Sequence, residues 1–251
     1  ETLKYSNSLK EFFDGFFNIM LERYNKSIWG EKAGSNSYYM DKILDIYPQA
    51  RILHIVRDPR DACCSVKKRS GSFYHAAAHW LYNNAAAIRY QELPNYYRIK
   101  YDDLVLNTKQ AVKNLCTWLN IEFENNLVDN KPNKYWETCA DYNMHQSWNV
   151  KPSDGISSKS IGKYKNELNE SHHFLLNRIK LTRKGQKKLN LSTKLSLINL
   201  ASEFDYNIKK NNNIKNANCK LYIDGICQYL QRAKKELKFK NTLWRPITTI
   251  L

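Results

Sequence analysis

The residues between Arg51 and Arg69 have the types and spacing that would bind a phosphate group. They read Arg-Ile-Leu-His-Ile-Val-Arg-Asp-Pro-Arg-Asp-Ala-Cys-Cys-Ser-Val-Lys-Lys-Arg. Arg57 follows a short apolar run, and Ser65 and Arg69 come later in the same stretch. A guanidinium group can bind two phosphate oxygens through parallel N–H bonds, and a hydroxyl adds a further donor. Three such groups brought together would form an anion site.

A strand and a tight turn are expected to position Arg57. The β-branched apolar run 52–56 is typical of a buried strand, although short runs are ambiguous between strand and helix. Pro59 cannot continue a central strand, so the strand should end by Arg57. Arg57 would then lie at the carboxyl end of the strand, where open α/β sheets bind their ligands.

A helix is expected to position Ser65 and Arg69. Asp58 or Asp61 can cap its N-terminus, and the helix should run to about Arg69. Ser65 and Arg69 are four residues apart and so share one helix face. The simpler alternative is an ordinary salt-bridged turn, in which Arg-Asp-Pro-Arg-Asp pairs its own charges.

The stretch resembles the 3′-phosphate-binding segment of the sulfotransferases, whose sulfuryl donor is 3′-phosphoadenosine 5′-phosphosulfate (PAPS). In that family, an Arg at the strand end and a Ser eight residues later hold the 3′-phosphate of PAPS. Arg57 and Ser65 take those positions here. Arg69 matches a further Arg found at this spacing in the tyrosylprotein sulfotransferases. The resemblance implies an α/β fold with a parallel sheet flanked by helices, related to the P-loop kinases.

The upstream segment 29–36, Trp-Gly-Glu-Lys-Ala-Gly-Ser-Asn, resembles the Gly-Glu-Lys-Thr-Pro loop of bacterial-type sulfotransferases, with Ala-Gly in place of Thr-Pro. In the family the Lys of this loop lies near the sulfuryl group, and Lys32 takes its place. An ammonium group there would stabilise negative charge on the bridging oxygen. The alternative is a surface ion pair of Lys32 with Glu31 or Asp41.

Two downstream segments extend the resemblance. A second strand, 96–101, is followed by Asp-Asp-Leu, which resembles the Tyr-Glu-Asp-Leu segment whose Tyr contacts the adenine side of the nucleotide; Tyr101 takes that position. Segment 160–168 resembles the Gly-Arg-Trp-Lys segment that closes the cofactor site. By position, Ser147 and Lys163 would reach the nucleotide phosphates, in a lid with a glycine hinge. A plain solvated turn is the alternative for these two residues.

One signature of the family is not found in the sequence. It is the Gly/Ser/Thr-rich loop after the first strand, which holds the 5′-phosphosulfate of the donor. The resemblance covers about residues 3–168, so the simplest expectation is that an N-terminal segment precedes this chain; a catalytically inactive relative is the other. The catalytic base is therefore unassigned, with Glu31, His75 and His79 as the local candidates.

The charge is unevenly distributed along the 251 residues. The net charge is +16, with 19 basic and 17 acidic residues in 1–150 but 21 basic and 7 acidic residues in 151–251. This excess suggests a polyanionic partner or only a solvated surface. The second functional hypothesis is accordingly a basic module that binds nucleic acid or another polyanion, although no nucleic-acid motif is recognised and no specific nucleic acid is expected.

The remaining patterns indicate the organisation of the chain. Residues 8–24 predict an amphipathic helix with a core-facing apolar stripe, and further helices are expected at about 38–47, 74–85, 104–119 and 221–237. We expect a sulfotransferase domain in 1–170 and a helical basic region packed on it in 171–251. Cysteine spacing shows no zinc pattern and fits a reducing compartment. No apolar run approaches the roughly 20 residues of a membrane span.

These observations favour a PAPS-dependent sulfotransferase that needs no metal. The acceptor would be a hydroxyl or amine on a small molecule, glycan or peptide. The location would be cytoplasmic, or the Golgi lumen for a fragment of a membrane-anchored eukaryotic protein. The sequence does not indicate an oligomeric state.

Overall fold

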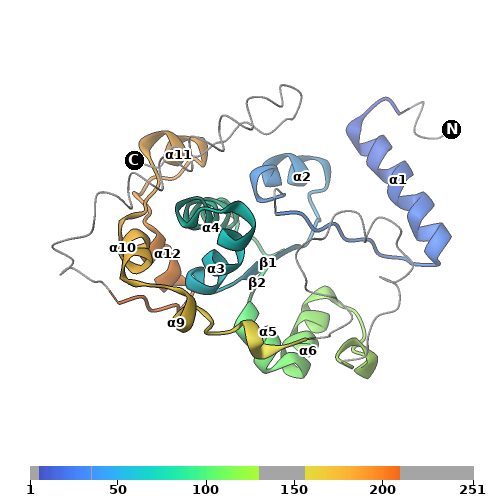
Figure 1. The fold of residues 1–251 in the computed structure, drawn as a ribbon. Helices are drawn as coiled ribbons and strands as arrows, with labels where there is room; N and C mark the ends of the chain where they lie inside the picture. The colour runs from blue at the N-terminus through green and yellow to red at the C-terminus, as the bar shows by residue number, and fades with distance from the viewer. Residues whose placement is uncertain (1–5, 35, 130–155, 210–251) are drawn as a thin grey trace.

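A parallel pair of strands lies at the centre of the molecule. The structure is a computed structural model that describes residues 6–34, 36–129 and 156–209. Strand β1 (Ile52–Val56) pairs in parallel with β2 (Tyr96–Lys100), in a register that sets Ile52 beside Tyr96 and Val56 beside Lys100. Helices flank this pair, as Figure 1 shows. The predicted α/β class with parallel strands is confirmed.

The described helices agree with the predicted ones through residue 119, with one addition. The predicted helix after the second strand is two helices, because Asn107 separates α5 from α6. The α-helices are α1 (Leu9–Tyr24), α2 (Met40–Ile46), α3 (Pro59–Ser70), α4 (Phe73–Ile88), α5 (Tyr101–Leu106), α6 (Thr108–Leu119), α9 (Tyr164–Glu167), α10 (Glu170–Arg178), α11 (Arg183–Lys188) and α12 (Leu197–Glu203), with 3-10 turns η2 (Asn36–Tyr38), η3 (Asn125–Leu127) and η5 (Ser158–Ser160). None of these helices is long and apolar enough to cross a membrane. The helix predicted at 221–237 lies outside the described residues.

Helix α3 begins and ends as its sequence dictates. The Asp58 carboxylate accepts a hydrogen bond from the backbone N–H of Arg60 at 2.8 Å, which caps the helix, and Pro59 occupies the first turn. Gly71 ends the helix with φ at +73°, a conformation that costs glycine little. Of the two predicted caps, Asp58 is therefore the one used, which leaves the carboxylate of Asp61 available for another role.

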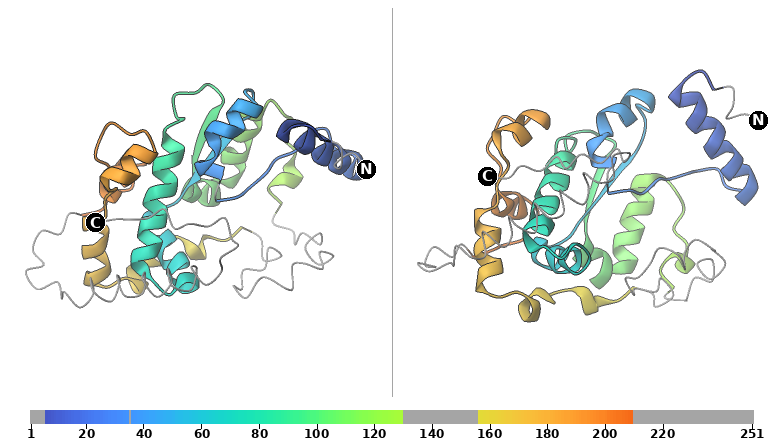
Figure 2. Two further views of the ribbon diagram at one scale, coloured as in Figure 1. Left: turned by 90° about the horizontal axis from the view of Figure 1, so that it is seen from above. Right: turned by 45° about the horizontal axis from the view of Figure 1, so that its top comes forward.

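The hydrophobic core is built around α4, whose small side chains allow close packing. Ala76, Ala77 and Ala85 are fully buried, and α3 packs along the helix. Helices α10 and α12 cover another side of α4, and both views of Figure 2 show them along its flank. Phe204 and Leu200 belong to the same buried cluster. Residues beyond 170 thus complete the core, although the sequence pattern indicated no helix between residues 170 and 221. The division of the chain at residue 170 stays a prediction.

The prediction that the stripe on α1 faces the core is wrong for the described part of the chain. No residue of this helix is buried, and Leu9 and Ile19 are 64% and 46% exposed. The helix stands at the edge of the molecule in Figure 1. Its contacts include Phe17 on Trp29, whose ring centres lie 3.7 Å apart, and a hydrogen bond from the Tyr47 hydroxyl to Asp14 at 2.8 Å. Helical periodicity reports an apolar face, but it does not report what covers that face.

Strand β1 is buried on one face, rather than on both. Ile52 and Val56 are buried, whereas Leu53 and Ile55 on the opposite face are 39% and 51% exposed. The buried face also contains His54, which is edge-on to the Phe204 ring. The apolar run predicted the strand correctly, but it overestimated the covering of its second face.

The imidazole of His54 is held neutral inside the core. The Asn84 amide nitrogen donates to the Trp80 carbonyl, which points the amide oxygen toward Nε2 of His54 at 2.9 Å. Nε2 therefore carries the proton, and Nδ1 accepts from the Tyr96 hydroxyl at 2.5 Å. Burial lowers the pKa of His54 to about 4, because desolvation disfavours the charged form.

This depressed pKa should make folding stability fall as the pH falls below about 6.5. The unfolded chain then binds a proton at this site while the folded chain does not, so the unfolded state gains stability until the pH reaches about 4. We expect His54 to account for a loss of about 2 kcal/mol in the free energy of unfolding between pH 7 and pH 5.

Urea unfolding of the wild type and of His54→Gln at both pH values measures this share. The variant should be less stable at pH 7 but should lose about 2 kcal/mol less on acidification. Equal losses in the two proteins would show that His54 does not titrate as described.

Candidate functional site

The side chain of Arg57 lies at the carboxyl end of β1, where the sequence predicted it. Its Nη1 donates to the Ser65 hydroxyl at 3.4 Å, and its Nη2 donates to the carbonyl of Ser160. Its backbone carbonyl accepts from the Trp80 indole at 2.9 Å, which fixes the turn against α4. The strand end, α3 and η5 therefore meet at this one guanidinium group.

The ammonium group of Lys163 approaches the same hydroxyl from the opposite segment. Lys163 Nζ donates to Ser65 Oγ at 2.6 Å. The Ser65 oxygen thus accepts from two cationic donors, which leaves its own O–H proton able to donate to an anion. The predicted Arg57, Ser65 and Lys163 are brought together, although Lys163 is about a hundred residues away in the sequence.

The aromatic ring of Tyr101 forms the next wall of the cluster. Tyr101 is the first residue of α5, directly after β2, and the Arg57 guanidinium lies 4.6 Å from the centre of its ring. Because β1 and β2 are parallel neighbours, their carboxyl ends place Arg57 and Tyr101 side by side. A ring next to a phosphate-type site is a suitable surface for a flat base.

The positive charge of this cluster is only partly compensated. Among the described residues, no carboxylate forms an ion pair with Arg57, and no acceptor reaches its buried Nε. Burial lowers the pKa of Lys163, and the neighbouring Arg57 lowers it further, while Glu167 opposes the shift. Two cations held close together and an unsatisfied buried donor are costly unless an anion binds between them.

The alternative of a self-paired turn holds for half of the motif. Arg60 pairs with Asp58, with Nη2 and Oδ2 2.6 Å apart, and both side chains are mostly buried. Arg57 has no such pairing in the part of the chain that the structure describes. Within Arg-Asp-Pro-Arg-Asp, Arg60 therefore neutralises Asp58, while the side chain of Arg57 is directed into the cluster.

Asp61 is the residue that sequence reasoning missed. It is 1% exposed, and its two oxygens accept the backbone N–H groups of Gly162 at 2.6 Å and Tyr164 at 2.9 Å. The Arg60 guanidinium lies 4.1 Å from the Tyr164 ring, which adds a second contact between α3 and this loop. The sequence signal for a buried role was weak: Asp61 lies in the first turn of α3, three residues after the cap Asp58.

The predicted catalytic residues are not drawn into this cluster. Glu31 and Lys32 are exposed, and Glu31 accepts from the Asn36 side chain. Asp41, the other proposed partner of Lys32, is bound instead by Arg89 and the Tyr90 hydroxyl. Within the described ranges, no hydrogen bond or ion pair connects Lys32 to Arg57. A role for Glu31 and Lys32 in catalysis stays a prediction.

Four other candidate residues have different outcomes. Arg69 lies in α3 one turn after Ser65, and only its backbone is described. Ser147 lies outside the described residues. His75 and His79 lie one turn apart on α4, with ring centres at 5.9 Å, and no group of three metal-ligating side chains occurs among residues 6–34, 36–129 and 156–209.

Comparison with known proteins shows what the chain is similar to. Residues 5–125 match the family model described as "Sulfotransferase family". The match covers just under half of the 251 residues. This range includes Arg57, Ser65 and Tyr101 but not Lys163, which lies outside the matched residues. No curated protein matches the chain.

Two solved structures share the fold of this chain. The sulfotransferase domain from the Synechococcus PCC 7002 olefin synthase has a TM-score of 0.54 and 17% identity, and the match covers 79% of this chain and 65% of that domain. The sulfotransferase domain from the curacin biosynthetic pathway has a TM-score of 0.52 and 16% identity, over 78% of this chain and 68% of that domain. At these identities the likeness shows the fold alone. The chain spans just under two thirds of the first domain.

Proposed function

We propose that this chain binds PAPS and transfers its sulfuryl group to a hydroxyl or amine acceptor. The observation that carries the proposal is the convergence of Arg57, Ser65 and Lys163, with two cationic donors on one hydroxyl. The 3′-phosphate would be held by these three side chains, with Arg69 and Ser147 as further candidates. The adenosine would lie on the side of Tyr101.

The cluster fits a phosphate in number and type of donors. The free Ser65 proton and the unsatisfied Nε of Arg57 both need an acceptor, and the Lys163 ammonium adds charge. A phosphate supplies several acceptor oxygens and the negative charge that the pair of cations lacks. The binding energy would be largest for the dianion, because two partly buried cations face it.

The chemistry proposed for the reaction follows from the bonds that change. The acceptor oxygen or nitrogen forms a bond to sulfur, while the bond from sulfur to the bridging phosphate oxygen breaks. The acceptor proton leaves to a base, for which Glu31 is the first candidate. Lys32 would stabilise the negative charge that builds on the bridging oxygen. The products are the sulfated acceptor and adenosine 3′,5′-bisphosphate, and no metal is required.

Thermal unfolding with two donors tests the proposal. PAPS at about 100 times its dissociation constant should stabilise the fold by about 2.7 kcal/mol, which corresponds to a rise of several degrees in melting temperature. Adenosine 5′-phosphosulfate, which lacks the 3′-phosphate, should have a much smaller effect at the same concentration. Equal shifts with the two compounds would contradict the proposed use of the 3′-phosphate.

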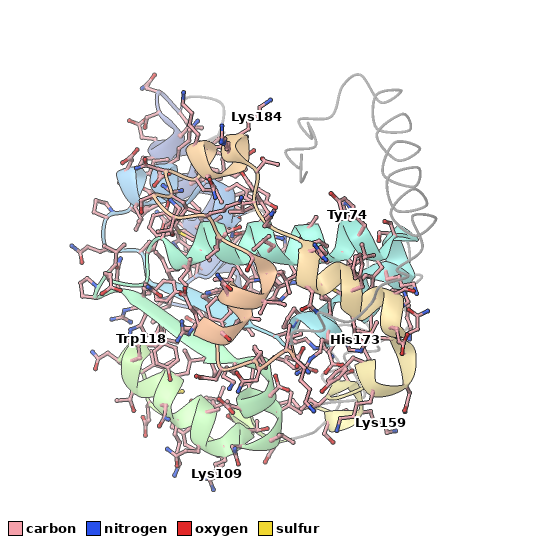
Figure 3. All side chains as sticks on the ribbon, turned by 90° about the vertical axis from the view of Figure 1, so that its left-hand side faces the viewer. Tyr74, Lys109, Trp118, Lys159, His173 and Lys184 are labelled. Atoms are coloured by element: carbon pink, nitrogen blue, oxygen red, sulfur yellow. The ribbon has the colours of Figure 1, made fainter. Side chains whose placement is uncertain are left out.

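Polyanion binding is a second candidate, because one surface is strongly basic. Between residues 171 and 202 there is no acidic residue. Seven exposed cations lie there, and none forms an ion pair with another described residue: Arg178, Lys180, Arg183, Lys184, Lys187, Lys188 and Lys194. In Figure 3, Lys184 on α11 lies at the opposite end of the molecule from Lys159, near the proposed nucleotide site.

Salt dependence separates the two candidates. A polyanion-binding module would bind oligonucleotides of any sequence, and that affinity would fall steeply between about 50 and 200 mM salt. Replacing Arg183, Lys184, Lys187 and Lys188 by Gln should weaken such binding but leave the affinity for adenosine 3′,5′-bisphosphate unchanged. Oligonucleotide binding without saturable nucleotide binding would favour this second function.

A further inference from the structure

The loop that contains Lys163 is held against α3 by one buried carboxylate. Asp61 is 1% exposed, and each of its oxygens accepts a backbone N–H group from the residue on one side of Lys163: Gly162 at 2.6 Å and Tyr164 at 2.9 Å. A carboxylate buried this deeply is costly unless it is hydrogen-bonded. The carboxylate of Asp61 is buried, and its two hydrogen bonds hold the backbone of the loop on both sides of Lys163.

We propose that Asp61 is a positioning residue that sets the phosphate selectivity of the site by fixing the loop around Lys163. This inference rests on the proposed function. The two hydrogen bonds flank Lys163 along the chain, so they determine where its side chain starts. That side chain then reaches Ser65 on the next turn of α3, one turn from Asp61 itself.

The loop around Lys163 has little regular structure of its own to hold it in place. Gly162 has φ at +74°, so the chain turns sharply just before Lys163. Helix α9 has only four residues and cannot hold its own position. Other contacts also reach this loop: Arg60 lies on the Tyr164 ring, Lys68 pairs with Glu167 at 2.9 Å, the Cys64 thiol hydrogen-bonds Glu167, and Arg57 donates to the Ser160 carbonyl. The exposed pair contributes little. Among the described contacts, Asp61 is the side chain that binds the backbone on both sides of Lys163.

The substitution Asp61→Asn tests this role with little change of shape. The amide keeps one acceptor oxygen but turns an NH2 group toward the second backbone N–H, so one of the two hydrogen bonds becomes a repulsive contact. The measured quantity is the ratio of the dissociation constants for adenosine 5′-phosphate and adenosine 3′,5′-bisphosphate. We expect this ratio to fall by about tenfold, the effect of one lost charge-assisted hydrogen bond.

A double-mutant cycle shows whether Asp61 acts through Lys163. Lys163→Met should also lower the ratio, and the combined variant should lower it no further than Lys163→Met alone, because the two residues act in series. A merely structural role would lower the melting temperature and leave the ratio unchanged. Asp41→Asn is the control, since the Asp41 carboxylate also accepts two donors, here from the Arg89 and Tyr90 side chains, but lies outside the cluster. The ratio of this variant should equal that of the wild type.

A second variant weakens the loop from the other side. Gly162→Ala imposes backbone strain at positive φ, while its added Cβ meets nothing closer than Lys165 Cε at 3.9 Å. It should lower the ratio in the same direction, and it provides the test if Asp61→Asn does not fold. Gly185→Ala on α11, where a Cβ meets nothing closer than Thr182 Oγ1 at 3.4 Å, is its control outside the site and should leave the ratio unchanged.

The outcomes separate this inference from the proposed function. A wild-type ratio near one would overturn the proposed function itself. A high wild-type ratio that survives in both folded Asp61→Asn and Gly162→Ala would overturn the role of Asp61 alone. A high wild-type ratio that falls in these variants but not in Asp41→Asn or Gly185→Ala would support the role of Asp61.

Discussion

Arg57→Ala should weaken the binding of adenosine 3′,5′-bisphosphate by about 1.5–3 kcal/mol, which is about a 10- to 150-fold loss of affinity. The Arg57 guanidinium contacts Ser65, the loop at Ser160 and the Tyr101 ring together. Its removal would take away charge and donors at once. The measurement is calorimetric titration of the wild type and the variant at the same salt concentration.

Two controls make the result specific. The affinity for adenosine 5′-phosphate, which lacks the 3′-phosphate, should change much less in the same variant. Arg23→Ala, a matched change at an exposed arginine of α1, should leave both affinities unchanged. An affinity of Arg57→Ala equal to that of the wild type would refute the assignment of Arg57.

Phe204→Ala should destabilise the fold by about 3–5 kcal/mol, the range for removing a large aromatic side chain from a core. Phe204 is fully buried, and its ring is edge-on to Trp80 and to His54. It connects α12 to α4 and to β1, the strand that positions Arg57. Urea unfolding monitored by circular dichroism measures the loss.

The matched control is a phenylalanine outside the core. Phe12 on α1 is 39% exposed, so Phe12→Ala should cost less than about 1 kcal/mol. Similar small losses for Phe12→Ala and Phe204→Ala would show that residues beyond 170 are not part of the cooperative core.

The parts of the fold that could be predicted from sequence are those controlled by local chemistry. Pro59 and Asp58 set the start of α3, and the apolar run 52–56 gave β1 at the residues observed. Strand β2 was also predicted, because its residues and the acidic pair Asp102-Asp103 that follows are local patterns. Each of these signals depends on neighbours in the chain.

The parts that could not be predicted depend on contacts between distant segments. The apolar stripe of α1 predicted a buried face but is exposed, whereas no pattern was recognised around Phe204, which is fully buried. Only tertiary packing decides which of these side chains is covered. In the site, Arg57 and Ser65 follow from strand and helix geometry, but Lys163 was placed there only by resemblance. Asp61 was predicted only as an alternative helix cap, and its contact with the loop was missed, because its partners are backbone N–H groups, which leave no trace in the sequence.

The central claim is that the cluster of Arg57, Ser65 and Lys163 recognises a 3′-phosphate. Calorimetric titration of the wild-type chain with adenosine 3′,5′-bisphosphate and with adenosine 5′-phosphate tests it most directly, because the two ligands differ only in that group. We predict saturable binding with one site and an affinity for the bisphosphate at least about tenfold higher. Equal affinities, or no saturable binding of either nucleotide, would contradict the claim.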